Sequence, residues 1–239
     1  MRHFSLCQVR SSEFLNFMIK IRQNLRKIAT IAICLAGSAT MFAQETGVVI
    51  NRVKWLTRNV DKPGTFVANP EDTGMFYQWN RKKAWPATGN VIGWDTTLLD
   101  YEEVLDNLFG SLTHKQNRKT IDSWEKVNDP SPAGWRVPTL NEIKSLLDTE
   151  KIKNELTTQN GVTGRKFTDK ATGLSIFLLA AGIRDSNDGT LNATGATGVY
   201  WSSTDNDRTS ACHSFFLKGL VNWLALYNRC GFSIRSVAD

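Results

Sequence analysis

The stretch "SPAGWRVPTLNEIKSLL", Ser131–Leu147, decides the fold prediction because it places a loop directly before a helix. Pro138 keeps the residue before it extended, so the chain enters the helix straight. Thr139 and Glu142 have the spacing of a capping box, in which a hydroxyl and a carboxylate each accept a hydrogen bond from a free backbone amide. The apolar residues that follow at helical spacing, and predict its buried face, are Ile143, Leu146 and Leu147.

Two side chains of the same loop, Trp135 and Arg136, are interpreted as structural. Trp135 stands where the loop meets the helix, and we expect its ring to fill the core there, with stacking on a ligand as the alternative. Trp201, in the later segment "VYWSST", is assigned a structural role as well. All eight tryptophans follow residue 43, and they are Trp55, Trp79, Trp85, Trp94, Trp124, Trp135, Trp201 and Trp223.

The first 43 residues have the layout of an export signal. Basic residues open it at 20–27, an apolar run follows at 28–35, and small residues end it at Ala43. The apolar run is too short to span a bilayer as a helix. Residues before Met18 indicate a start site assigned upstream of the true one. We therefore expect an exported protein, in the periplasm, on the outer surface or secreted, whose mature part is a single domain at 44–239.

The charge balance of that domain argues against a nucleic-acid partner. The chain has 29 basic and 23 acidic residues, and its first 43 residues hold six of the basic and one of the acidic ones. The domain keeps 23 against 22, a net charge of +1. A nucleic-acid-binding surface needs a clear positive excess. No later stretch is long and apolar enough to predict an integral membrane segment.

The other segments predict short strands and one further helix. Residues 47–57 are rich in β-branched residues and predict a strand, and "MFYQWN" predicts a short aromatic one. Apolar residues at helical spacing between Leu98 and Leu112 predict a second helix. The C-terminal third predicts β-structure in the segments "LSIFLLAAGIR", "VYWSST", "CHSFFLK", "NWLALYN" and "GFSIRSV". Helices followed by clustered strands indicate an α+β class.

No sequence pattern predicts a reaction, a cofactor or a transition metal. Only His114 and His213 remain after the leader, and neither has a partner at metal-binding spacing. A P-loop, a dinucleotide fingerprint and a nucleophile elbow are absent. We therefore assign no catalytic residue, no cofactor and no metal. The run "STDNDR" is typical of a solvated loop, and a loop that contacts a ligand through Asp205 and Asp207 is the alternative.

Two cysteines, Cys212 and Cys230, follow the leader. An even pair in an exported chain favours a disulfide. The two residues flank a pair of strand-sized segments, whose ends meet in an antiparallel hairpin. A two-residue loop would set Cys212 opposite Tyr227, so the bond requires a longer loop or a bulge.

Seven segments match a known pattern in order across residues 47–237: "VKWLTRNV", "GMFYQWN", "SWEKVNDPSPAGWRVPT", "NGVTGRKFT", "FLLAAGIRDSNDGTL", "GVYWSST" and "GFSIRSV". Together they resemble the Fibrobacter succinogenes major paralogous domain, a family of exported Bacteroidetes proteins. That family is similar to C-type-lectin-like domains. The resemblance implies an α+β fold with two helices packed on small twisted antiparallel sheets, and it brings no established reaction.

Two departures from the family pattern carry information. Ser131 and Ser236 stand where many members have cysteines, and a pair changed together is what the loss of one disulfide would look like. The Glu-Pro-Asn and Trp-Asn-Asp patterns of calcium-dependent sugar-binding lectins are missing. This argues against calcium-dependent sugar binding.

The resemblance implies an exported, non-enzymatic binding or cell-surface module that recognises a glycan or a protein. Trp79, Trp85 and Trp94 are its candidate stacking faces, with core burial as the alternative. Two other functions remain open. One is an enzyme of the formylglycine-generating-like group, which uses reactive cysteines, and free thiols would favour it. The other is a structural subunit of a surface assembly, and self-association would favour it.

Overall fold

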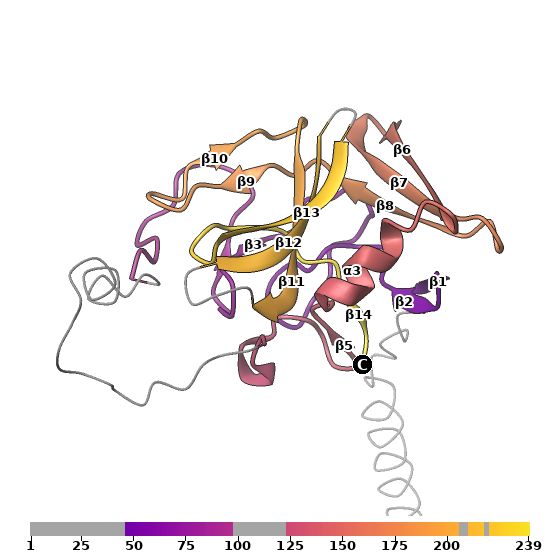
Figure 1. Cartoon of the computed structure of the whole chain (residues 1–239). Coiled ribbons are helices and arrows are strands. Elements are labelled where there is room, and N and C mark those ends of the chain that lie inside the picture. The colour runs from indigo at the N-terminus through magenta and orange to yellow at the C-terminus, as the bar shows by residue number, and fades with distance from the viewer. Residues whose placement is uncertain (1–45, 98–122, 206–209, 218–219) are drawn as a thin grey trace, which may run out of the picture. The chain divides into compact units, whose positions relative to one another are not determined.

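The computed structural model describes residues 46–97, 123–205, 210–217 and 220–239 (Figure 1). The chain divides into two compact units, Met1–Glu45 and Thr46–Asp239, and the described residues belong to the second. The predicted leader and the helix predicted between Leu98 and Leu112 lie outside the described residues. In the described ranges no helix has the length and apolar character needed to cross a bilayer.

A four-stranded sheet joins segments from both ends of the unit. Its strands, in spatial order, are β1 (Val48–Ile50), β2 (Val53–Trp55), β14 (Val237–Ala238) and β5 (Trp135–Arg136). Val237 pairs with Trp55 on one side and with Arg136 on the other. The sheet therefore holds the loop of the opening motif, through β5, against the last strand of the unit.

A second sheet consists of β6 (Ile152–Gln159), β7 (Val162–Asp169) and β8 (Ser175–Leu179), in that order. The two long strands are joined by Asn160 and Gly161, which have φ values of 47° and 82°. Positive φ at both central residues is what a type I′ turn requires, and Asn-Gly is its preferred sequence. The local sequence thus sets this hairpin.

The third sheet follows the chain order β11 (Gly198–Asp205), β12 (Ser210–Leu217) and β13 (Leu220–Tyr227). β11 is buried along most of its length, whereas β13 is exposed along most of its length. Two small ribbons, β3 (Phe76–Tyr77) with β4 (Ala84–Trp85) and β9 (Ile183–Arg184) with β10 (Leu191–Asn192), complete the strands.

The described residues contain one α-helix, α3 (Leu140–Leu146), and a short 3-10 helix, η1 (Lys126–Asn128). Thr139 is the N-cap of α3, and both hydrogen bonds of the predicted capping box are present. Ile143 and Leu146 are buried against the second sheet and the inner face of the third. Here the helix start, the helix and its buried face are confirmed.

The predicted fold class is wrong. The expectation was an α+β, C-type-lectin-like domain with two helices, but the described residues are mostly short strands in small antiparallel sheets with a single α-helix. The stretch 151–170 received no assignment from its sequence pattern, and it forms a hairpin of two eight-residue strands. Residues 47–57 fold as two strands around a turn at Asn51 and Arg52, both with positive φ, rather than as one.

Candidate ligand-binding site

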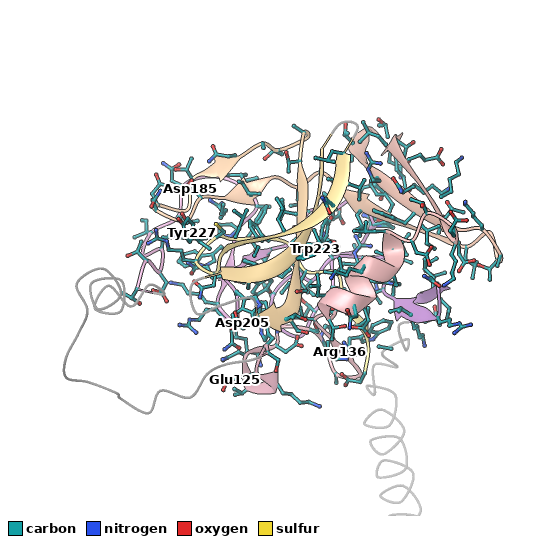
Figure 2. The ribbon with its side chains drawn as sticks, in the orientation of Figure 1. Glu125, Arg136, Asp185, Asp205, Trp223 and Tyr227 are labelled. Carbon is teal, nitrogen blue, oxygen red and sulfur yellow. The ribbon has the colours of Figure 1, made fainter. Side chains whose placement is uncertain are left out.

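A hollow of about 520 Å³ opens beside the loop of the opening motif. Its walls come from the segment 123–139, which contains η1, β5 and the N-cap of α3, and from Ser203 of β11 and Asp239. Figure 2 shows Glu125 and Arg136 on the side of the molecule where these segments meet. Pockets of 300–1,000 Å³ are the usual size for small ligands.

Side-chain hydrogen bonds hold the loop in shape. The carboxylate of Asp129 accepts from the backbone amides of Ser131, at 2.8 Å, and Val137, at 2.9 Å. Ser131 and Ser236 place their hydroxyl oxygens 2.8 Å apart. Gly134 turns the loop at a φ of 82°, in the region that L side chains rarely adopt. The wall of the hollow is thus fixed before any ligand arrives.

An ion pair ties the loop to the helix. Arg136 donates to both carboxylate oxygens of Glu142, at 2.8 and 2.6 Å, and the same carboxylate accepts from the backbone amide of Thr139 at 2.7 Å. Burial alone would raise the pKa of Glu142, but the hydrogen bonds from Arg136 and Thr139 hold this pKa below its usual value. Hydrogen bonding to Glu142 in turn raises the pKa of Arg136.

Two tryptophans, Trp135 and Trp124, form the apolar part of the wall. Trp135 is 9% exposed and meets Phe66 edge to face, with ring centroids 6.1 Å apart. Trp124 packs against Trp79 with centroids 5.9 Å apart, and its ring nitrogen is buried without a hydrogen-bond partner in the described residues. Trp135 therefore both fills the core, as expected, and lines the hollow.

Polar groups complete the lining. Ser123 and Lys126 are exposed, and Ser203 is half-buried. Their hydroxyls and ammonium group offer donors and acceptors at the surface of the hollow. Apolar ring edges with a few polar groups are the usual composition of a small-ligand site.

The three tryptophans proposed as stacking faces do not form one site. Trp79 and Trp85 are only 4% and 3% exposed and belong to different core clusters. Trp94 is half-buried against Trp85, with centroids 4.9 Å apart, and donates from its ring nitrogen to Ser186. Core burial, the alternative reading, describes Trp79 and Trp85, and Trp201 is fully buried too.

The predicted ligand loop is described only in part. Asp205 ends β11 and is half-buried, and Figure 2 shows it above Glu125. Asp205 does not line the hollow, although Ser203, two residues before it, does. Asp207 lies outside the described residues.

The predicted disulfide is not formed. Cys230 is a free, buried cysteine. The register of the hairpin sets Cys212 opposite Ala225, five residues before Cys230, and not opposite Tyr227 as expected for a two-residue loop, because β12 ends at Leu217 and β13 begins at Leu220. Burial, with a smaller contribution from the charge of Asp185, raises the pKa of the Cys230 thiol to about 11. At neutral pH this cysteine is protonated, and the thiolate is the reactive form.

Sequence reasoning did not find Ser123, Lys126, Asp129 and Ser203 as site residues. One signal was available, because Asp before Pro favours a turn, and Asp129 precedes Pro130 in "NDPSP". The other residues carry no local signal. They become a site only where β11 meets the loop, through the hydrogen bond from the amide of Ser203 to the carbonyl of Pro138 at 2.7 Å.

Comparisons with known proteins add no relative to this picture. No family model, no curated protein and no solved structure matches the chain. Within the part that the structure describes, no group of three or more His, Cys, Asp or Glu side chains is placed to hold a metal ion. The hollow is therefore interpreted from its own geometry.

Proposed function

We propose that this protein is an exported, non-enzymatic binding module whose hollow takes the end of a glycan chain. The observation that carries the proposal is the hollow of about 520 Å³ on a loop that is fixed by its own hydrogen bonds. When a ligand binds to a rigid loop, little conformational entropy is lost, because the loop is already ordered. The resemblance to a family of exported proteins agrees with this role.

The lining favours a sugar over a flat protein surface. Sugars present apolar C–H faces beside hydroxyl groups, which suit aromatic rings next to polar side chains. Trp124 and Trp135, which are 7% and 9% exposed, offer ring edges rather than open faces, and Ser123, Lys126 and Ser203 supply donors and acceptors.

The enzyme alternative finds less support. It requires a reactive cysteine, and Cys230 is buried with a raised pKa of about 11, so it is a poor nucleophile at neutral pH. Cys230 also lies outside the lining of the hollow. The proposed module therefore binds without using this residue in a reaction.

An array of immobilised mono- and oligosaccharides tests the proposal when it is probed with the protein and with Ala133→Trp. Ala133 lines the hollow and is exposed, so a large ring there blocks the space without removing a core contact. We expect the protein to bind a defined set of glycans and the variant to lose at least about tenfold in affinity, which corresponds to about 1.4 kcal/mol.

Ala171→Trp is the matched control. Ala171 is an exposed alanine in the turn before β8, away from the hollow, and the same substitution there should leave binding unchanged. Equal binding by the protein and by Ala133→Trp would place the ligand elsewhere. Binding to no glycan, together with capture of a protein from outer-membrane fractions, would replace the sugar with a protein ligand.

A further inference from the structure

The strand β13 ends the third sheet on one side. It pairs with β12 along its whole length, from Leu220 opposite Leu217 to Tyr227 opposite Ser210. In the described sheet its other edge has no neighbouring strand. An edge strand offers a row of backbone amides and carbonyls to any further strand.

Apolar side chains of the described residues concentrate on this strand. Ten large hydrophobic residues in the described ranges are well exposed, and half of them belong to β13. Their exposed fractions lie between 37% and 50%, and they are Leu220, Trp223, Leu224, Leu226 and Tyr227. Figure 2 labels Trp223 and Tyr227 on this strand. Because side chains alternate along a strand, these two lie on one face and Leu220, Leu224 and Leu226 on the other, so both faces are apolar at this edge.

The second sheet shows how the same molecule protects an edge. β6 is also an eight-residue edge strand, and it carries Lys153 and Glu155, which form an ion pair at 2.9 Å. Charged side chains of this kind are the usual means by which edge strands avoid pairing. β13 reads "LVNWLALY" and contains no charge, no proline and no glycine. Its edge lacks the protection that β6 has.

We propose that β13 pairs antiparallel, about a two-fold axis, with β13 of a second copy of this chain. The two three-stranded sheets then become one sheet of six strands. When the axis passes between the two copies of Leu224, Leu224 meets Leu224 and Val221 meets Tyr227 of the other copy, because directly opposite residues of a sheet lie on the same face. Apolar residues thus face apolar residues, and neither strand carries a charged side chain of its own.

The area at β13 fits a concentration-dependent dimer. Aromatic side chains bury about 150–250 Å² each, and leucines bury less. The exposed fractions given above leave roughly 400 Å² of apolar side chain per copy. Edge-to-edge pairing covers only part of this area, so two copies bury less than the ~1,000 Å² at which stable specific interfaces begin. A permanent dimer would require more.

The test is the molecular mass of the purified full chain, measured by sedimentation velocity over a concentration series. We expect monomer at low concentration and dimer at high concentration. Leu224→Lys puts two like charges beside the axis and should raise the dimer dissociation constant by about a hundredfold or more. Leu156→Lys is the matched control, since Leu156 is a similarly exposed leucine on β6, and it should leave the constant unchanged.

Charge reversal identifies the second copy as the partner. Leu224→Glu should also be monomeric, and mixing it with Leu224→Lys should restore a dimer, because residue 224 then meets the opposite charge. Hydrogen exchange of the unmodified protein gives a reading without any variant: the backbone amides of β13 should become protected as concentration rises. A chain that stays monomeric throughout, or a dimer that Leu224→Lys leaves intact, would overturn the proposal.

None of the residues that line the hollow belongs to β13. The proposed dimer and the proposed glycan site can therefore be tested independently of each other. A monomer that binds glycans would refute the inference alone, and a dimer that binds none would refute the proposed function alone.

Discussion

Glu142 connects three consecutive parts of the chain: the loop, the cap and the helix. Its carboxylate accepts from the guanidinium of Arg136 and from the backbone amide of Thr139. A charged acceptor strengthens each of these hydrogen bonds. The residue that caps the helix therefore also holds the wall of the hollow.

Replacing Glu142 with Gln should lower the free energy of unfolding at pH 7 by about 1 kcal/mol, since solvent reaches Arg136 and screens part of the pair. The pKa of Glu142 is lowered in the folded protein from its ordinary 4.5. Its contribution is therefore complete above that value and is lost as the pH falls through the folded pKa. Urea unfolding at a series of pH values should show the difference from the unmodified protein shrinking below about pH 4.5.

Glu155→Gln is the control for this pH series. Glu155 pairs with Lys153 on the exposed edge of β6, where an ion pair contributes little. Its substitution should change stability only slightly at any pH. A difference for Glu142→Gln that is the same at pH 3 and pH 7 would show that its charge is not what stabilises the loop.

Ser131 and Ser236 allow a second test at this scale. Their hydroxyl oxygens lie 2.8 Å apart although the residues are 105 positions apart in the chain. Replacing both with cysteine should form a disulfide, because the longer C–S bonds bring the sulfurs toward bonding distance. Closing so long a loop should stabilise by about 2–4 kcal/mol, somewhat less than the chain-entropy limit.

Non-reducing peptide mapping and unfolding with and without reductant measure this bond. Ser131→Cys alone is the control, and it should show no effect of reductant on stability. Two thiols that remain open to alkylation in the double variant under oxidising conditions would contradict the geometry of the loop.

The hairpin of β6 and β7 depends on its turn. Gly161 has a φ of 82°, and a Cβ there would meet no atom, so the cost of a side chain is purely conformational. Gly161→Ala should lower the free energy of unfolding by about 1–2 kcal/mol. Asn160→Gly keeps a residue that tolerates positive φ and should be nearly neutral. A urea midpoint unchanged by Gly161→Ala would refute the turn assignment.

Local signals explain which elements the sequence predicts. The capping box, the helix after it and the strands β11 to β13 depend on spacing over a few residues, and the structure has them. The Asn160-Gly161 signal is equally local, and it favours more β-structure than an α+β fold with two helices contains. The burial of Trp79 and Trp85 has no local signal, since an aromatic ring suits a core and a binding face alike.

The hollow could not be predicted for a different reason. Ser203 reaches the loop from a strand about 70 positions further along the chain, and only the packing of β11 on the loop brings them together. The free edge of β13 likewise appears only when the order of the sheet is known. The sequence shows the residue types, but which of these residues come into contact depends on the tertiary structure.

At the scale of the whole molecule, contacts divide the chain between Glu45 and Thr46, close to the end of the leader that the sequence predicts. We predict that protein recovered from its native host begins near Gln44. N-terminal sequencing measures this directly. Recovery of chains that still carry residues 28–35 would contradict export by removal of the leader.

The most direct test of the binding proposal uses the indole resonances of the tryptophans in isotope-labelled protein, titrated with the best glycan from the array. Trp124 and Trp135 line the hollow, whereas Trp85 and Trp94 lie in another cluster. We predict that the indole N–H signals of Trp124 and Trp135 shift on binding and that those of Trp85 and Trp94 do not. Shifts confined to Trp85 and Trp94 would contradict the site in the hollow.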